Sequence, residues 1–225
     1  MELAVKICGV SDPRTVESAA ALGARYLGFV FFPPSPRALS LDAAAALTDA
    51  VPPGIERVGV MVDPDDAMLD ALLARVRLDI LQLHGHETPA RLAEVRARTG
   101  CKVMRAFRVA EAADVAAARD YAEAADLFLF DAKPRPDAVV PGGGGLSFDW
   151  GLLDGVAPGR PWALAGGLTP DNLAAAVRRT RAPIVDVSSG IESRPGVKDP
   201  LLLRRFLEEA DRLRRAPEPV IEESA

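Results

Sequence analysis

The stretch PWALAGGLTPDNLAAAVRRTRAPIVDVSSG, residues 161–190, contains the pattern that decides the fold. It opens with an apolar run, Pro161 to Ala165, and passes through a Gly-Gly turn into a segment of helical periodicity, Pro170 to Thr180. It then returns to a second apolar run, Ile184 to Val187. Short and nearly continuous apolar runs are typical of buried parallel strands. The stretch therefore predicts a strand, a helix and a second strand parallel to the first.

The same alternation runs through the rest of the chain. Helical segments separate most of six earlier apolar runs, which are Leu3 to Cys8, Tyr26 to Phe32, Arg57 to Val62, Asp79 to Leu83, Lys102 to Phe107 and Leu127 to Phe130. Eight strands that alternate with helices in about 210 residues indicate an α/β protein with a (β/α)8 TIM barrel. The main rival is a doubly wound open sheet, which seldom uses eight strands with so few residues left over.

Capping residues and prolines indicate where the helices begin. Pro64 follows Asp63 and Pro170 follows Thr169, so we expect those two helices to start at the prolines. The remaining helices are expected over Pro13 to Leu22, Leu41 to Ala50, Glu87 to Thr99, Glu111 to Ala122 and Asp199 to Leu213. Because no linker or composition shift interrupts the chain, we expect one catalytic domain over residues 1–215 and an acidic, disordered tail over residues 216–225.

Composition excludes several classes of function. The 27 Lys and Arg against 32 Asp and Glu give a net charge of −5, so we expect binding to neither nucleic acid nor a membrane surface. No apolar run is long enough to span a membrane, and the start MELAVKICGV lacks the features of a secretory signal. With only two cysteines, we expect a reduced cytoplasmic protein. We expect a monomer, with a homodimer as the alternative.

Glycine and serine follow the last two predicted strands, at the end of the barrel where active sites lie. The segments Gly166-Gly167 and Ser188-Ser189-Gly190 leave backbone N–H groups exposed near helix starts, which is the chemistry of an anion site. Loops after strands seven and eight are also the usual phosphate site of this fold. The alternative is that these glycines only make tight turns. The run Gly142 to Gly145 would add further amides.

Two titratable residues at other strand ends are candidates for acid–base chemistry. Cys8 is a competent base or nucleophile if a nearby cation or helix N-terminus lowers its pKa, although a cysteine there is as often a small core residue. Asp131 ends an apolar strand, and burial would raise its pKa and suit a general acid. Alternatively, Asp131 caps the next loop. A thiolate and a protonated carboxyl group in one pocket would form an acid–base pair.

Three further residues of the same rim are candidates for substrate contacts. Arg37 follows a rigid Pro-Pro-Ser-Pro segment and is able to bind a carboxylate with two hydrogen bonds, although a solvated surface arginine is commoner. His84 and His86 form an H-x-H pattern, which is a weak metal signal without a third ligand, so we expect His84 to form hydrogen bonds at the rim and no metal to bind. Asp186 is either a second acid or an orienting group.

Several motifs, taken in order, resemble one enzyme family. They are Lys6-Ile7-Cys8-Gly9, Gly28-Phe29-Val30-Phe31, Ser35-Pro36-Arg37, Gln82-Leu83-His84-Gly85, Phe148-Asp149-Trp150, Ala165-Gly166-Gly167-Leu168, Asp186 to Glu192 and Pro195 to Asp199. From Lys6 to about Phe206 the chain is similar to the phosphoribosylanthranilate isomerases of tryptophan biosynthesis. The resemblance implies a (β/α)8 barrel that converts N-(5-phosphoribosyl)anthranilate to 1-(2-carboxyphenylamino)-1-deoxyribulose 5-phosphate. This Amadori rearrangement needs no metal or organic cofactor.

The resemblance also implies roles for particular residues. It makes Cys8 the general base, Asp131 the general acid and Arg37 the partner of the anthranilate carboxylate, and we expect His84 and Asp186 to contact the substrate as well. The implied phosphate-binding residues are Gly143, Gly144, Gly145, Gly166, Gly167, Ser188, Ser189 and Gly190. One feature departs from the family, because many members carry Thr or Asn within the loop that here reads Gly142 to Gly145. That change removes a side-chain contact, makes the loop more flexible and keeps the backbone amides.

Three other interpretations use the same barrel. A phosphosugar epimerase of the common type would need metal-binding His and Asp residues on several strands, and the chain has two histidines. A phosphate-binding synthase of the neighbouring tryptophan step would need a Lys and Glu set that the sequence does not place. A non-catalytic phosphate-binding barrel would have no need of both Cys8 and Asp131.

Overall fold

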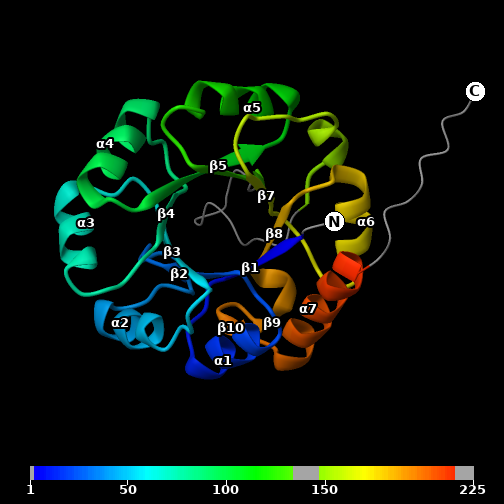
Figure 1. Cartoon of the computed structure of the whole chain (residues 1–225), viewed down its shortest axis with the longest axis horizontal. Helices are drawn as coiled ribbons and strands as arrows, with labels where there is room; N and C mark the ends of the chain where they lie inside the picture. Colours follow the sequence, from blue (N-terminus) through cyan, green and yellow to red (C-terminus); the bar gives the residue numbers. More distant parts are fainter. Residues whose placement is uncertain (1–2, 134–146, 216–225) are drawn as a thin grey trace, which may run out of the picture.

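The computed structural model describes residues 3–133 and 147–215, which form a closed barrel of eight parallel strands surrounded by helices (Figure 1). The strands are β1 (Ala4–Cys8), β2 (Tyr26–Val30), β3 (Glu56–Met61), β4 (Ile80–Leu83), β5 (Lys102–Val109), β6 (Leu127–Ala132), β7 (Trp162–Leu164) and β8 (Ile184–Val187). The helices are α1 (Pro13–Ala21), α2 (Leu41–Asp49), α3 (Asp66–Leu73), α4 (Pro89–Thr99), α5 (Ala112–Ala116), α6 (Leu173–Thr180) and α7 (Pro200–Arg215). Three 3₁₀ helices, η1 (Ala117–Tyr121), η2 (Trp150–Leu153) and η3 (Ser189–Ile191), lie between them. The predicted (β/α)8 barrel is confirmed, and the predicted tail lies outside the described residues.

Strand β1 closes the barrel by pairing with both β2 and β8. Lys6 lies opposite Tyr26 of β2 on one side and opposite Asp186 of β8 on the other. All pairs within the barrel are parallel, so each strand is reached by a crossover connection over the outer surface. Closure brings the first and last units of the chain side by side.

Alternate residues of each strand face the barrel interior and the surrounding helices. In β6, Phe128 and Phe130 pack in the layer between strands and helices, whereas Leu127 and Leu129 fill the interior. The next interior position is Asp131. The inward-facing position nearest the carboxyl end of this apolar strand therefore carries a titratable side chain.

Helix α3 begins later than its proline predicts. Its N-cap is Asp65 and its first residue is Asp66, so the cap that was expected at Asp63 is wrong. Asp63 instead has a left-handed backbone, with φ of +46°, and its carboxylate accepts a hydrogen bond from the His86 N–H at 2.6 Å. The side chain that would have capped the helix joins the end of β3 to the end of β4.

Helix α6 also begins later, at Leu173 rather than at Pro170. The Thr169 N–H donates to the Asn172 side-chain oxygen at 2.8 Å, and the Asn172 Nδ2 donates to the Gly167 carbonyl at 2.9 Å. Residues that the sequence assigned to the first turn of the helix therefore hold the glycine turn after β7 in shape.

A short antiparallel hairpin that was not predicted follows η3. Its strands are β9 (Glu192–Arg194) and β10 (Val197–Lys198). Gly196 in its turn has φ of +83°, and a Cβ there would lie 2.5 Å from the Pro36 carbonyl oxygen. The hairpin therefore packs closely against the loop after β2 and brings its charged residues to the barrel rim.

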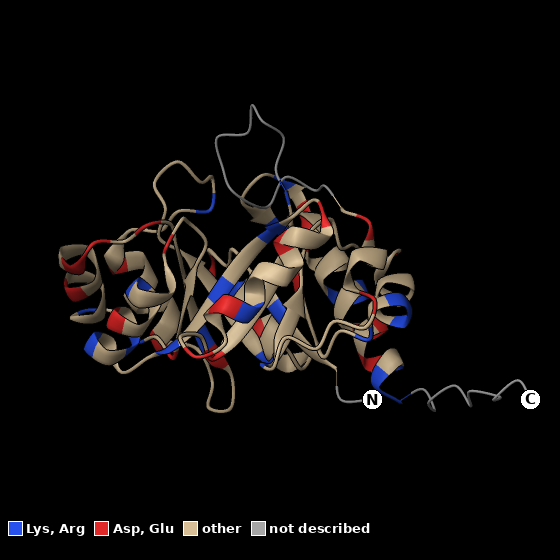
Figure 2. Ribbon diagram, turned by 90° about the horizontal axis from the view of Figure 1, so that it is seen from above, with Lys and Arg blue, Asp and Glu red and all other residues tan. Residues whose placement is uncertain are grey.

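Charged residues of both signs are interspersed over the helices, as Figure 2 shows for one side of the barrel. Many form ion pairs, such as Arg215 with Asp211 within α7. At the end of the barrel where the strands begin, the Arg214 Nε donates to the Leu3 carbonyl at 2.6 Å and connects α7 to the start of β1. None of the helices in the described ranges is long and apolar enough to cross a membrane.

Candidate active site

A buried ion pair lies where the first strand, β1, pairs with the last strand of the barrel, β8. Lys6 is fully buried, and its Nζ donates to Asp186 Oδ1 at 2.9 Å across the β1–β8 seam. Burial alone would lower the pKa of Lys6, but the Asp186 carboxylate and the Cys8 thiol outweigh it and raise that pKa above 10.5. Lys6 is therefore a fixed positive charge inside the barrel mouth, and Asp186 is its counter-ion.

Cys8 lies two residues beyond Lys6 and faces the same interior. Its side chain is buried, and Gly28 of β2 leaves room for it, because a Cβ at Gly28 would lie 3.1 Å from the Cys8 sulfur and 3.2 Å from Lys6 Nζ. Burial raises the pKa of the thiol above 9.0, while the charges of Lys6 and Lys198 act to lower it. Two nearby ammonium groups are an arrangement that favours the thiolate once a proton is removed.

Asp131 ends β6 on the inward face and is 7% exposed. Burial raises the pKa of its carboxyl group to about 7, and the Asp186 charge acts in the same direction. The Ala132 N–H, which donates to Asp131 Oδ1 at 2.9 Å, and the charges of Lys6 and Arg108 act against this rise in pKa. A carboxyl group of this kind holds a proton near neutral pH and is able to release it, which suits a general acid.

Cys8 and Asp131 belong to one electrostatic cluster. The charges of Lys6 and of Asp186 each act on the pKa values of both groups. Cys8 approaches this ion pair from β1 and Asp131 from β6, both at the carboxyl ends of their strands. The two candidates for acid–base chemistry therefore share one end of one barrel.

His84 follows β4 and is directed toward Asp131. Its Nε2 lies 3.7 Å from Asp131 Oδ2, beyond hydrogen-bonding distance, and this buried atom has no hydrogen-bond partner within the described part of the chain. Burial lowers the pKa of His84 to about 3, and the charges of Arg108 and Arg105 act in the same direction. The ring is therefore neutral at physiological pH, and hydrogen bonding at the rim stays a prediction for it.

The two histidines of the H-x-H pattern do not converge. His86 is exposed, with its Nδ1 3.1 Å from Asp63 Oδ2, while His84 is buried and turned toward Asp131. Across residues 3–133 and 147–215, no group of three or more His, Cys, Asp and Glu side chains is arranged to hold a metal ion.

Arg37 is buried and forms an ion pair with two hydrogen bonds. Its Nε and Nη2 donate to the two carboxylate oxygens of Glu192 at 2.8 and 2.7 Å. Its aliphatic part lies over the strand end that carries Cys8, since a Cβ at Gly9 would be 2.5 Å from Arg37 Cδ. The alternative of a solvated surface arginine is therefore wrong. Burial would raise the pKa of Glu192, but Arg37 and Lys198 lower it to about 2.

The turns after β7 and β8 lie against each other. A Cβ at Gly190 would overlap the Leu168 carbonyl oxygen, and a Cβ at Gly166 would lie 2.6 Å from the Ala132 nitrogen. Gly166 also has φ of +87°. Glycine is therefore required at both positions, because the two turns and the end of β6 pack backbone against backbone.

These turns carry backbone N–H groups that have no acceptor. Within the described residues, no acceptor binds the backbone N–H groups of Gly166, Gly167, Ser188 and Ser189, all of which are partly exposed. Such a group of N–H donors is suited to an anion. Gly143, Gly144 and Gly145 lie outside the described residues.

Sequence reasoning did not select several residues that complete this site. Lys6 was noted only as a neighbour of Cys8, and Arg108, which lies opposite Asp131 in the β5–β6 ladder, was left out. Lys6 lies two residues before Cys8, and Arg108 lies two residues after the inward-facing Ala106. Because inward-facing residues of a strand are two apart, this spacing could have identified both. No sequence signal of that kind marks Glu192 or Lys198, which lie on the short hairpin.

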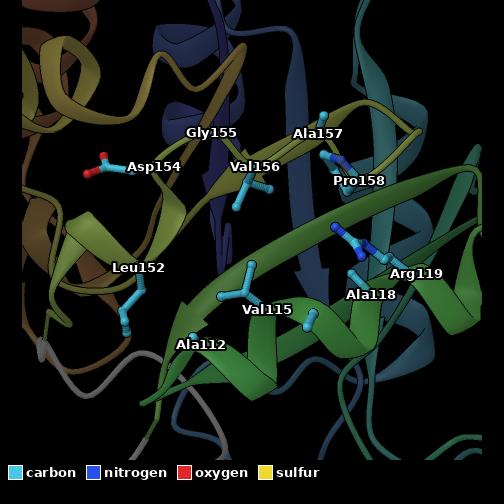
Figure 3. Close-up of a pocket in the computed structure, with 11 residues that line it drawn as sticks. Ala112, Val115, Ala118, Arg119, Leu152, Asp154, Gly155, Val156, Ala157 and Pro158 are labelled. Atoms are coloured by element: carbon cyan, nitrogen blue, oxygen red, sulfur yellow. The ribbon is translucent and has the colours of Figure 1, made fainter.

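A separate hollow of about 210 Å³ lies on the outer surface, between α5 with η1 and the segment over residues 152–158 (Figure 3). Val115, Arg119, Leu152 and Val156 are among the residues that line it. None of the predicted site residues belongs to it, so it is distinct from the cluster at the strand ends.

The chain is similar to proteins of one family over most of its length. The sequence profile described as N-(5'phosphoribosyl)anthranilate (PRA) isomerase matches residues 5–209. The N-(5'-phosphoribosyl)anthranilate isomerase of Paracoccus denitrificans is 57% identical over 210 residues, which cover 93% of this chain and 98% of that protein.

Solved structures agree with this similarity. A structure of monomers generated from the dimeric isomerase of Thermotoga maritima is 32% identical, with a TM-score of 0.79, and the match covers 93% of this chain and 98% of that one. A phosphoribosylanthranilate isomerase in complex with reduced 1-(o-carboxyphenylamino)-1-deoxyribulose 5-phosphate is 31% identical, with a TM-score of 0.79 and the same coverage.

Proposed function

We propose that Cys8 and Asp131 transfer the protons in the reaction of the N-(5'-phosphoribosyl)anthranilate isomerase family, to which this chain belongs. The enzyme converts N-(5'-phosphoribosyl)anthranilate to 1-(o-carboxyphenylamino)-1-deoxyribulose 5-phosphate in tryptophan biosynthesis. The observation that carries the assignment is the cluster itself. A thiol and a carboxyl group, both with pKa values raised by burial, flank the Lys6–Asp186 ion pair at the strand ends.

The reaction requires proton transfers at two places on the sugar. Asp131 donates a proton to the furanose ring oxygen, the bond from C1 to that oxygen breaks, and the amine lone pair forms a Schiff base. The Cys8 thiolate then removes the proton from C2, and the electron pair moves to give an enolamine. Tautomerisation of the enolamine yields the ketone. Lys6 stabilises the thiolate, and proton transfer by a positioned group contributes about 10²–10⁴-fold in rate.

The phosphate of the substrate is assigned to the two turns that present unpaired amides. We propose that Gly166, Gly167 and the turn over residues 188–190 bind it through their N–H groups. A dianion held there fixes the far end of the substrate and orients C1 and C2 between the acid and the base. A contribution from Gly143, Gly144 and Gly145 stays a prediction, because these residues lie outside the described ranges.

The other end of the substrate carries the anthranilate carboxylate. We propose that Arg37 contacts this group while it remains paired with Glu192, since Arg37 lies beside the strand end that carries Cys8. His84 is proposed to offer its neutral Nε2 to the substrate, and Asp186 to orient Lys6. These assignments involve no metal or organic cofactor.

The proposed roles are tested by single substitutions. Cys8→Ala and Asp131→Asn are each expected to lower turnover by at least about 10²-fold, measured as loss of anthranilate-substrate fluorescence. Cys101→Ala is the matched control, because Cys101 is half-buried before β5, at the opposite end of the barrel. Circular dichroism and retained binding of a product analogue would show that the variants fold. Near-normal turnover by Cys8→Ala would remove the base assignment.

We propose a cytoplasmic monomer as the working form. Of the large apolar side chains in the described residues, only Val197 and Leu201 are exposed, at 41% and 72%, which leaves little apolar surface for a stable dimer. The relative from Thermotoga maritima is described as dimeric, so a homodimer is the alternative. Sedimentation at micromolar concentration would distinguish them, and a single species of twice the chain mass would exclude the monomer.

A further inference from the structure

The hairpin contains a buried lysine whose hydrogen bonds have no role yet in the proposed function. The side chain of Lys198 is only 1% exposed. Its Nζ donates to Glu192 Oε1 at 2.8 Å, to the Ser188 carbonyl at 3.1 Å and to the Ser188 hydroxyl at 3.4 Å. The three hydrogens of the ammonium group therefore each have an acceptor. Burial acts to lower the pKa of Lys198, and the Glu192 carboxylate opposes that change.

Glu192 extends these contacts to the loop after β2. Its carboxylate accepts hydrogen bonds from Arg37 and Lys198 and, at 3.2 Å, from the Gly196 N–H. A continuous series of hydrogen bonds thus runs from Arg37 through Glu192 and Lys198 to Ser188. Its two ends are the proposed contact for the substrate carboxylate and the first residue of the proposed phosphate-binding turn.

Ser188 depends on this series for its position. The β8 strand and its pairing with β1 end at Val187, so the ladder does not hold the next residue. The Ser188 carbonyl accepts from Lys198 and, at 3.4 Å, from the Ile191 N–H. The lysine is the shorter and charged donor, and hydrogen bonds to charged groups are about twice as strong as neutral ones.

We propose that Lys198 is a positioning residue for substrate binding, which holds the phosphate-binding turn through Ser188 and Arg37 through Glu192. The proposal rests on the proposed phosphate site. The physical basis is preorganisation, because a turn that hydrogen bonds already hold in place loses less conformational entropy when it binds a dianion. Lys198 itself need not touch the substrate.

The test compares Lys198→Met with the wild-type enzyme. Methionine keeps the unbranched apolar chain and removes the charge, while Glu192 keeps its Arg37 partner. We expect the inhibition constant of inorganic phosphate to rise by about tenfold or more, since a hydrogen bond to a charged group is lost. The KM for substrate is expected to rise by a larger factor than kcat falls, because Lys6, whose charge lowers the pKa of Cys8 more than that of Lys198 does, remains in place.

Two further variants make the result specific. Lys102→Met removes a lysine from an exposed ion pair with Glu56, 2.7 Å long, at the other end of the barrel, and is expected to leave phosphate inhibition unchanged. The double variant Lys198→Met with Glu192→Gln also removes the charged partner of Arg37, so it is expected to be no more stable than Lys198→Met, and phosphate inhibition is expected to stay weak. A merely structural role would instead predict that folded Lys198→Met is inhibited by phosphate as strongly as the wild-type enzyme.

The outcomes distinguish the role of Lys198 from the existence of the phosphate site. If wild-type enzyme is inhibited by phosphate and Lys198→Met is inhibited equally, the role of Lys198 is wrong and the phosphate site stands. If the double variant regains wild-type inhibition, the role of Lys198 is also wrong. If phosphate does not inhibit even the wild-type enzyme at millimolar concentration, the phosphate site itself is wrong, and the positioning role is lost with it.

Discussion

At the scale of single residues, Asp131 shows how burial raises the pKa of a carboxyl group at a cost in stability. Its pKa in the folded chain is about 7, well above the ordinary 3.8, chiefly because it is buried. At low pH the group is protonated in both the folded and the unfolded chain. As pH rises, the unfolded chain loses this proton first, so the folded state loses stability until the pH passes about 7.

The Asp131→Asn variant should therefore be more stable than the wild-type enzyme at pH 8. We expect a gain of roughly 1–4 kcal/mol in the free energy of unfolding at pH 8, because the raised pKa amounts to that order of energy. The gain should shrink toward pH 4. Urea unfolding at the two pH values measures it, and an equal difference at both would show that ionisation of Asp131 is not the cause.

The pH dependence of the reaction should reflect both groups. The acid must be protonated and the base deprotonated, yet the pKa of Asp131 is about 7 and that of Cys8 lies above 9.0. The reactive form is then a minor species, and kcat/KM should rise up to about pH 7, stay flat, and fall above the thiol pKa. The two apparent values belong to the pair rather than to either residue.

A spectroscopic titration would assign the upper value. In a Cys101→Ser background only Cys8 contributes thiolate absorbance, and its midpoint should lie above that of an ordinary thiol because burial raises its pKa. A midpoint below that of an ordinary thiol would contradict the electrostatic description of Cys8, whatever the kinetic profile.

At the scale of elements, the strands were predictable and the loop contacts were not. Each apolar run became a strand because continuous Val, Ile, Leu and Phe residues are buried on both faces of a barrel strand. The start of α3 was predicted wrongly because Asp63 and Asp65 are equally good caps by sequence. A hydrogen bond to His86, on the next unit, decides that Asp65 takes the role.

Arg105 of β5 and Glu87, which follows β4, form a buried ion pair whose disruption should lower stability strongly. Arg105 donates to Glu87 at 2.7 Å, and the same carboxylate accepts from the backbone N–H groups of Asp63 and Gly85. Arg105→Met leaves Glu87 as an unpaired buried charge, which typically costs about 3–5 kcal/mol.

Urea unfolding of Arg105→Met measures that cost. The double variant Arg105→Met with Glu87→Gln should recover part of it, because the unpaired charge is then removed. A loss below about 1 kcal/mol in the single variant would be the value of an exposed ion pair and would contradict the buried arrangement.

At the scale of the whole molecule, closure of the barrel explains why the fold and the residues at the strand ends could be predicted from the sequence. The fold follows from eight similar units, and the strand ends of such a barrel converge whatever the details. The positions of Cys8, Asp131 and the glycine turns at the strand ends were therefore predictable. The pairing of Arg37 with Glu192 joins residues 155 positions apart through a hairpin of two short strands, and neither periodicity nor capping encodes that contact.

The pairing of β1 with β8 has a consequence for co-translational folding. Lys6 leaves the ribosome 180 residues before Asp186, its partner. Until then Lys6 lacks the carboxylate that pairs with it in the folded chain. The ion pair therefore forms only after β8 has been made, and activity should appear only after that point.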